Sequence, residues 1–308
     1  MEAQDAGLYY RGIDRICWTA LVPRHELRKL GSSHDWSYME GKSMDAFVHY
    51  GSCRNEKFHG PRPHTLGQNR LLAALPEEVY ERLAPDLERV RLQLGSVLHE
   101  SGERLRYIYF PIDCLVSLFC ELDDGASGEI AVAGNEGLVG IALFMGGKST
   151  LSRAVVQCAG FAFRIRADIL VREFESGSAL QEVVLLYTQA QSTQTAQTAV
   201  CNRFHAVEQQ LCRWLLMSLD RIPSNNLTMT QELIASNLGV RREGVTLAAG
   251  RLQAAGLIHC SRGKITVLDR LKLEQWACEC YAVVEKEFDR LLPKRTYRSD
   301  RSIDGRTN

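Results

Sequence analysis

Residues 227–260 read LTMTQELIASNLGVRREGVTLAAGRLQAAGLIHC, and they contain two helical patterns separated by a glycine. Thr230 is placed to cap the first helix, because its side-chain oxygen can accept a hydrogen bond from the first turn. Gly239 follows that helix and supplies a tight turn. A second helix is expected over about 241–255. The stretch therefore predicts two short helices joined by a tight turn.

The second of these helices has one apolar side and one polar side. At about 100° per residue, the apolar side chains expected to pack inward are Val245, Ala248, Ala249 and Leu252. The opposite side carries Glu243, Thr246, Leu247, Gly250 and Arg251, with Arg242 at its border. The start of the helix therefore presents charged side chains on its outer side.

A basic hairpin is predicted directly after the second helix. Residues 256–269, GLIHCSRGKITVLD, alternate apolar and polar side chains around a turn at Arg262-Gly263-Lys264. Eight basic and three acidic residues lie within 221–272, a local net charge of +5 that suits a polyanion. Helix, turn, helix and basic hairpin predict a winged helix-turn-helix. A helical hairpin docked on a larger core would explain the apolar spacing but not the basic tip.

The whole chain is electrically balanced, so its charge is informative only locally. Its 308 residues include 37 basic and 37 acidic side chains, and they are enough for two modest domains. Ten cysteines are scattered without the dense spacing of a small disulfide scaffold, which favours reduced thiols. The sequence shows neither a signal-like apolar run nor a segment of membrane-spanning length. We therefore expect a cytoplasmic protein.

Changes of pattern along the chain mark five segments. Residues 1–66 lack a sustained period and end in a polar run with glycine and proline, which is typical of a poorly ordered extension. Short β-rich runs separated by glycine occupy 89–167 and predict a small antiparallel barrel or sandwich. The expected segments are an extension at 1–66, a β domain at 67–176, a long helix at 177–222, the winged helix-turn-helix at 223–292 and a polar tail at 293–308.

A long helix is expected because no proline occurs between Gly177 and Ile222. Its middle, TQAQSTQTAQTAVCN at 188–202, is small and polar, so the helix needs a surface to pack against. One option is its own β domain, and the other is a second copy of the chain, with Gln and Thr hydrogen bonds fixing the register. We expect both contacts together. The candidate dimer residues are Val184, Tyr187, Gln191, Gln194 and Thr198.

Several motifs between residues 67 and 292 are similar to those of one protein family. They are NRLLAALP at 69–76, YFP at 109–111, GNEGLVG at 134–140, CNRFHAVEQQLCRWLLMSLDRI at 201–222 and the stretch at 227–260. Together they resemble a subgroup of the Crp/Fnr superfamily of bacterial transcription regulators. The resemblance implies an α+β fold with an antiparallel β-roll like a cyclic-nucleotide-binding domain, a long dimerisation helix and a C-terminal winged helix-turn-helix.

The same resemblance implies a function. The chain would be a homodimeric, sequence-specific DNA-binding transcription regulator. Its partners would be double-stranded DNA with a near-palindromic site, a second copy of itself and RNA polymerase. The alternative is a ligand-binding or protein-interaction module whose helix-turn-helix does not bind DNA. We do not expect an enzyme, because the sequence contains no nucleophile–base pair and no phosphate-binding loop.

The resemblance also implies which residues contact DNA. In the family an Arg and a Glu at the start of the second helix read base edges, and here they correspond to Arg242 and Glu243, with Thr246 one turn further. Arg241 stands where a capping Ser or Thr is usual, and Leu247 stands where several members place another base-reading Arg. The DNA sequence that this chain binds should therefore differ from the sites of the best-known family members. The candidate DNA-backbone contacts are Thr230, Gln231, Arg241, Arg251, Arg262 and Lys264.

A degenerate phosphate cassette is expected in the β domain. Cyclic-nucleotide binders of the family use a Gly-Glu pair and, further along, an Arg. Here Ile141 follows Gly140, so the carboxylate is missing. Arg153 is displaced by about one position, and such a shift in a strand turns a side chain to the other face. We therefore expect no cyclic nucleotide, and the sequence does not define the effector.

The cysteines and histidines predict no metal site. Cys278 and Cys280 are two residues apart, and on a helix such side chains do not share a face, which favours incidental thiols. His205 fits a hydrogen-bonded structural residue better than a haem ligand. Cys17 and Cys53 are far apart, which does not favour an iron–sulfur cluster. We expect neither a metal nor another cofactor.

Overall fold

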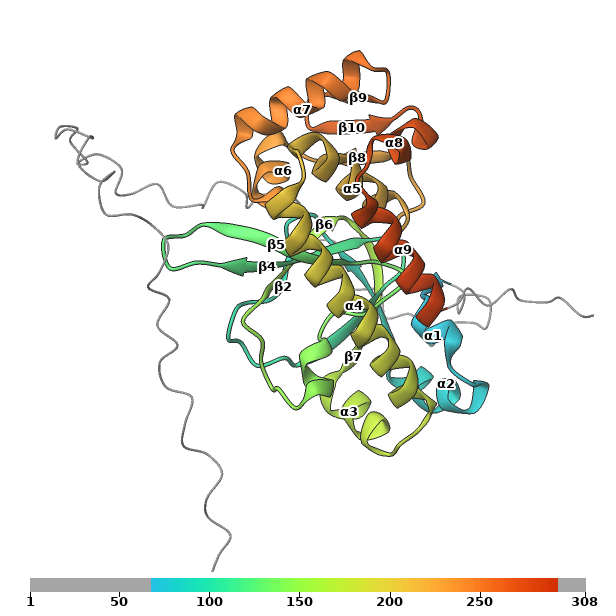
Figure 1. The fold of residues 1–308 in the computed structure, drawn as a ribbon. Helices are drawn as coiled ribbons and strands as arrows, with labels where there is room; N and C mark the ends of the chain where they lie inside the picture. The colour runs from blue at the N-terminus through green and yellow to red at the C-terminus, as the bar shows by residue number, and fades with distance from the viewer. Residues whose placement is uncertain (1–67, 293–308) are drawn as a thin grey trace, which may run out of the picture. The chain divides into compact units, whose positions relative to one another are not determined.

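The computed structural model describes residues 68–292, so the predicted extension at 1–66 and the predicted tail at 293–308 lie outside the described residues. Within this range, two short helices lead into antiparallel strands, and a long helix and a small winged module follow (Figure 1). This arrangement confirms the predicted α+β class. No helix within the described range is long and apolar enough to cross a membrane.

Among the described residues, seven strands form the two sheets of the β-roll. One sheet has the order β1-β7-β3, with β1 at Glu88–Leu92, β7 at Gly160–Arg166 and β3 at Tyr107–Pro111. The other has the order β2-β6-β4-β5, with β2 at Val97–His99, β6 at Arg153–Cys158, β4 at Leu115–Glu121 and β5 at Ser127–Ala133. All pairings are antiparallel, and the seven strands span Glu88 to Arg166, which agrees with the β-rich region predicted at 89–167.

Two apolar layers stabilise the β-roll. Small side chains such as Ala131 and Ala154 fill the space between the sheets. A second, larger apolar cluster includes Phe110 and Phe163 and joins the roll to its helices. The short elements around the roll are α1 at Arg70–Ala74, α2 at Glu77–Leu83, the 3-10 turns η2 at Ala84–Asp86 and η3 at Ile141–Met145, and α3 at Ala167–Glu175.

The long helical segment consists of two helices rather than one. α4 spans Ala179–Phe204, and α5 spans Val207–Leu219. The continuous helix predicted over 177–222 is therefore wrong, although α4 alone has 26 residues.

Side chains replace the helical hydrogen bonds that the break removes. His205 and Ala206 both have extended backbone. Gln210 Nε2 donates to the His205 carbonyl at 2.8 Å, and Gln209 Oε1 accepts from the Ala206 amide at 3.2 Å. Because two glutamines supply these contacts, the chain can bend here without a proline.

The predicted dimer residues of α4 are buried within the same chain, against the β-roll and, for Thr198, against Arg213 of α5. Tyr187 Oη donates to the Leu138 carbonyl at 3.0 Å, and Gln194 Nε2 donates to the Val132 carbonyl at 3.0 Å. The buried set comprises Val184, Tyr187, Gln191, Gln194 and Thr198. Their assignment to a contact between two copies is wrong, because the chain itself already covers them.

The two helices predicted from the stretch at 227–260 are confirmed. α6 spans Gln231–Leu238, and Thr230 caps it by accepting a hydrogen bond from the Leu233 amide. Gly239 follows with a left-handed φ of 64°, and α7 spans Arg242–Ala254. The four residues predicted to pack inward are buried: Val245, Ala248, Ala249 and Leu252.

The wing contains one strand more than predicted. β9 at Ile258–Ser261 and β10 at Lys264–Val267 form the expected antiparallel hairpin. A third strand, β8 at Asn226–Thr228, pairs with β10, so the strand order is β8-β10-β9. β8 is three residues long, and so short a strand leaves no alternation pattern in the sequence.

Two helices at the end of the described chain return it to α4. α8 spans Arg270–Trp276, and α9 spans Glu279–Leu291. α9 packs along α4 (Figure 1), where the rings of Tyr187 and Phe288 have centroids 6.2 Å apart. The beginning of α9 consequently lies beside the end of α4.

Candidate functional site

The outer face of α7 is open to solvent near its N-terminus. Arg242, Glu243 and Thr246, the predicted base-reading residues, are all exposed there. Thr246 Oγ1 lies 2.9 Å from Gln231 Oε1 of α6, so the two helices share a polar contact at this surface. Leu247 is 64% exposed beside them. The structure thus places the three predicted base-reading residues on one exposed surface.

Arg242 forms an ion pair with the preceding helix. Its guanidinium lies 2.6 Å from Glu232 Oε1, and both side chains are 61% exposed. An exposed pair of this kind contributes about 0–1 kcal/mol. The guanidinium can therefore exchange Glu232 for another acceptor at little cost.

The predicted DNA-backbone residues lie in different local settings. Arg241 occupies the N-cap position of α7 without making a side-chain cap, in agreement with the capping position expected for it. Arg262 and Lys264 are exposed at the tip of the wing. Thr230 caps α6, and Arg251 forms an ion pair with a glutamate of α5.

The basic charge available on this module is smaller than the sequence count of +5 indicates. Arg221 is buried in an ion pair with Glu136 at 2.6 Å, so it cannot face a polyanion. Arg270 pairs with Asp220 at the end of α5. Within the described residues, three of the eight basic side chains form no ion pair: Arg241, Arg262 and Lys264. The local net charge overestimates the free basic charge because several of the acidic partners lie outside residues 221–272.

The residues of the degenerate cassette have different structural surroundings. Gly140 precedes η3, and Ile141 is its first residue. Arg153 binds Glu100 at 2.9 Å and Glu121 at 3.2 Å, while its neighbour in β6 faces the space between the sheets. The arginine therefore faces away from the interior of the roll.

A buried carboxyl lies where β5 meets α5, and no sequence pattern indicated it. Glu129 accepts hydrogen bonds from Ser117 Oγ at 2.5 Å and from Trp214 Nε1 at 3.0 Å. Burial raises the pKa of Glu129 to about 7, although both hydrogen bonds and the charges of Arg213 and Arg221 act in the opposite direction. The group therefore changes its charge near neutral pH.

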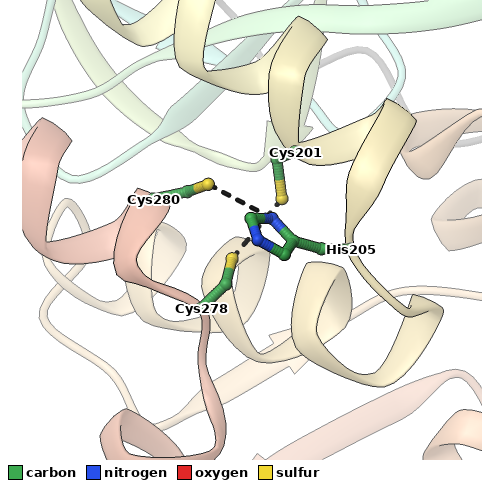
Figure 2. Close-up of side chains that lie close together, drawn as sticks. All are labelled: Cys201, His205, Cys278 and Cys280. Atoms are coloured by element: carbon green, nitrogen blue, oxygen red, sulfur yellow. Dashed lines mark hydrogen bonds between the residues drawn. The ribbon is translucent and has the colours of Figure 1, made fainter.

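Three thiols and one imidazole converge where α4 ends and α9 begins (Figure 2). Cys201 Sγ lies 3.5 Å from Cys278 Sγ, and Cys280 Sγ lies 3.4 Å from His205 Nδ1. The expectation that Cys278 and Cys280 face apart is wrong, because Cys278 precedes α9 with extended backbone. The hydrogen bond between the thiols lowers the pKa of Cys201 and raises that of Cys278. Sequence spacing could not indicate this cluster, since Cys201 and Cys278 are 77 positions apart.

Comparison with protein families identifies the C-terminal module. Residues 209–276 match the Crp-like helix-turn-helix domain. The match begins within α5, ahead of the boundary at residue 223 that the sequence patterns suggest, and it ends with α8. No curated protein matches the chain.

Solved structures resemble the described fold over most of their own length. A protein named as a transcriptional regulator of the crp/fnr family from Eubacterium rectale has 18% identity and a TM-score of 0.54, with 67% of this chain and 96% of that one covered. FixK2 from Bradyrhizobium japonicum has 15% identity and a TM-score of 0.53, with coverages of 62% and 98%. CLP from Xanthomonas campestris, a c-di-GMP responsive global regulator, has 19% identity and a TM-score of 0.51, with coverages of 63% and 100%. At such identities the likeness shows the fold.

The described chain combines an antiparallel β-roll, a long helix and a winged helix-turn-helix, the architecture that it shares with these solved structures. Residues 209–276 form a Crp-like helix-turn-helix domain, and the described fold is similar to that of Crp/Fnr regulators, in agreement with the resemblance of the motifs. The chain has the fold of a Crp/Fnr-type transcription regulator, and the similar proteins named above are regulators rather than enzymes.

Proposed function

We propose that the chain is a homodimeric, sequence-specific DNA-binding transcription regulator of the Crp/Fnr type. The observation that supports this most strongly is the exposed N-terminal face of α7, where Arg242, Glu243 and Thr246 are free of the apolar core. A recognition helix enters the major groove with such a face toward the bases. Arg242 suits the acceptors of guanine, and Glu243 suits the amino group of cytosine.

Phosphate contacts would come from the exposed cations that have no carboxylate partner. Arg241, Arg262 and Lys264 meet this condition within residues 68–292. Because every nucleotide carries a phosphate, these contacts position the protein and do not select a sequence. Gln231, which contacts α7 from the start of α6, and Arg251 in the last turn of α7 could add contacts at the border of the same surface.

A second copy would pack on the face of α4 that the β-roll leaves open. This face repeats in alternating steps of four and three residues, at Leu185, Gln189, Ser192, Ala196, Ala199 and Arg203, all of them exposed. Such spacing forms one stripe along a helix and allows two helices to pack side by side. Small residues in the middle let the backbones approach, and Leu185 at one end is 50% exposed. We call this set the α4 stripe.

The dimer would present two recognition helices to one DNA duplex. A two-fold axis along the α4 stripes would place the two copies of α7 in successive major grooves, about 34–36 Å apart. The target is therefore a near-palindromic site. A contact with RNA polymerase and a cytoplasmic location stay predictions from the sequence.

The signal would act at the β-roll through a ligand other than a cyclic nucleotide. Ile141 stands where a carboxylate would bind the ribose, and Arg153 is occupied by two glutamates. A change in the roll could reach the winged module directly, because α6 packs on β5 and Ser127 Oγ lies 3.2 Å from Ser236 Oγ.

A module that does not bind DNA is the second candidate. Leu247, exposed on the outer face of α7 at a position where related proteins place a base-reading arginine, favours a protein partner over a nucleic acid. The two candidates differ in their response to salt, since DNA binding weakens steeply as salt rises.

Selection of genomic DNA fragments by the purified protein, followed by gel retardation at several salt concentrations, tests the proposal. Arg242→Ala should weaken binding to the selected site by about 1–3 kcal/mol per half-site and change binding to random DNA much less. Lys264→Ala should weaken binding to all sequences alike and lower the salt slope by about 1. Lys286→Ala, which removes an exposed lysine of α9, is the matched control.

Two results would contradict the proposal. Equal losses on selected and random DNA for Arg242→Ala would remove its base-reading role. An unmodified protein that retards no fragment at low salt would favour the module that does not bind DNA.

A further inference from the structure

Four possible metal ligands from distant parts of the chain meet at one point (Figure 2). We call the set of Cys201, His205, Cys278 and Cys280 the Cys3His cluster. One ligand atom of each residue lies within 4.8 Å of the others. The three thiols are buried, and the imidazole side chain is 17% exposed. The cluster is therefore nearly closed to solvent, as structural metal sites are.

The distances suit a single tetrahedral ion. Zinc lies about 2.3 Å from a thiolate sulfur and about 2.0–2.1 Å from an imidazole nitrogen, so neighbouring ligand atoms of a regular tetrahedron lie about 3.6–3.8 Å apart. The sulfurs of Cys201 and Cys278 are 3.5 Å apart, and Cys280 Sγ is 3.4 Å from His205 Nδ1. The fold thus holds two ligand pairs close to the spacing that zinc requires, and the remaining pairs lie within 4.8 Å.

The two helix ends provide a suitable electrostatic environment. Cys278 is the N-cap of α9, and Cys280 lies in its first turn, where the positive end of the helix dipole favours thiolates. Cys201 lies in the last turn of α4, and His205 is its C-cap, where the negative end favours a cation. A cation held between the two ends is stabilised by both.

Neighbouring side chains orient the ligands. His205 directs Nδ1 toward Cys280 and lies with Nε2 3.5 Å from Glu279 Oε1. Metal-binding histidines usually donate their second ring N–H to such a carboxylate, which fixes the ring. Gln197 Nε2 also donates to Cys280 Sγ at 3.1 Å, a contact that stabilises the thiolate.

A buried arginine beside the cluster has no carboxylate partner. Arg213 of α5 is 3% exposed, and within residues 68–292 its hydrogen bonds go to Thr198 Oγ1 and Met217 Sδ. It lies near enough for its charge to act on Cys201. A buried charge that forms no close ion pair is unfavourable, and Glu129, the carboxyl on which Arg213 also acts, has a pKa raised to about 7. One zinc ion with three thiolates and a neutral imidazole carries a net charge of −1, which would balance Arg213.

We propose that the Cys3His cluster binds one zinc ion in a structural site. A disulfide between Cys201 and Cys278 would use two of the four groups and leave the imidazole and the third thiol without a role. An iron–sulfur cluster contains several metal atoms and holds its ligands farther apart than one ion does. A closed set of sulfur and nitrogen ligands with tetrahedral spacing is typical of zinc.

The ion would stabilise the corner between α4 and α5. Two of its ligands belong to the end of α4, and the other two belong to the start of α9, which follows the winged module. Zinc would therefore hold the angle at which the chain leaves the long helix. This inference is independent of whether α7 binds DNA.

Metal analysis of the purified full-length chain tests the site. We expect one equivalent of zinc per chain after dialysis. Replacement of zinc by cobalt should produce the visible absorption of tetrahedral cobalt together with thiolate-to-cobalt charge transfer. Removal of the ion with a strong chelator should lower the midpoint of thermal unfolding, because the bound ion stabilises the folded chain.

Variants of the ligands locate the ion. Cys201→Ser and Cys280→Ser should reduce zinc to near zero, whereas Cys158→Ser, a partly buried thiol of β6, should keep one equivalent. His205→Ala should lose zinc, and His205→Cys should retain it because a fourth thiolate completes the tetrahedron. Glu279→Gln should weaken zinc affinity about 10–100-fold by releasing the imidazole ring. Circular dichroism shows which variants are folded.

Several results would overturn the proposal. A folded chain that contains no zinc and takes up no cobalt would do so. Zinc retained by both serine variants would place the ion elsewhere. Iron with an equal amount of acid-labile sulfide, or a disulfide between Cys201 and Cys278 in the purified protein, would replace the zinc assignment by a redox-active one.

Discussion

Glu129 is a buried carboxyl whose charge changes near neutral pH. Its carboxyl is fully covered by β4, β5 and α5, and burial raises its pKa from 4.5 to about 7. Since the folded pKa lies above the unfolded one, the protonated carboxyl favours the folded state. This contribution is complete below about pH 4.5 and is lost as the pH rises through about 7.

Glu129→Gln should remove this pH dependence. The amide keeps the shape of the side chain and its contacts with Ser117 and Trp214 but cannot ionise. Relative to the unmodified protein, the variant should gain roughly 2–3 kcal/mol in free energy of unfolding between pH 5 and pH 8, because one pKa unit corresponds to about 1.4 kcal/mol. Urea unfolding at several pH values measures the difference. A difference that stays constant over this range would contradict the assignment.

The surroundings of some residues could be predicted from the sequence, and those of others could not. Glu243 was predictable as an exposed group because the helical period places it opposite Val245, and Arg242 was predictable at the border of the same polar side. Arg221 looked equivalent to the other basic residues, yet it is buried against Glu136. The partner lies 85 positions away, and no local pattern indicates such a pair.

At the scale of elements, α4 has two faces with different partners. Its buried side binds the β-roll through Tyr187 and Gln194, and its α4 stripe is exposed. Gln and Thr occur on both sides of this helix, so composition could not indicate which side is covered. Which side of α4 is buried is known only once the position of the sheet is known.

Ala196→Glu should weaken the proposed dimer. Near a two-fold axis the substitution brings two carboxylates together and buries them, which should cost at least about 1.4 kcal/mol and raise the dimer dissociation constant at least about tenfold. Sedimentation equilibrium of the purified protein measures this constant. Ala254→Glu, the same substitution at an exposed position of α7, is the control and should leave it unchanged. A dimer equally stable in both variants would place the interface away from the α4 stripe.

At the scale of the whole described chain, the segment GNEGLVG joins the β-roll to α4 and α5. A Cβ at Gly137 would lie 2.4 Å from the ring of Tyr187, and one at Gly134 would lie 2.5 Å from Cβ of Arg221. Only glycine permits this approach. The buried ion pair of Arg221 with Glu136 then links the loop to the end of α5.

Glu136→Gln and Arg221→Gln should show this link as a coupling energy. Each single variant should lose about 3–5 kcal/mol of unfolding free energy, because it leaves one buried charge without its partner. The double variant should lose less than the sum of both, by about 1–3 kcal/mol. Urea unfolding provides all three values. Asp168→Asn, which breaks exposed pairs with Arg166 and Arg172, should change the unfolding free energy little and serves as the control.

The sequence by itself determined the kind and order of most elements. The seven strands of the β-roll and the two helices after Thr230 follow from apolar periodicity and turn residues. These signals are local, because the same few residues form the hydrogen bonds and present the apolar face of each element. The predicted outer face of α7 follows for the same reason.

Only the tertiary structure decided which of these surfaces and side chains meet. It broke the long helix at His205, covered one side of α4, paired Arg221 with Glu136 and assembled the Cys3His cluster. Most of these features join groups that are far apart in sequence. The helix break depends instead on the side chains of Gln209 and Gln210, which form hydrogen bonds with backbone groups at the break. The proximity of the distant groups is set by the path of the folded chain, and periodicity within one segment contains no information about that path.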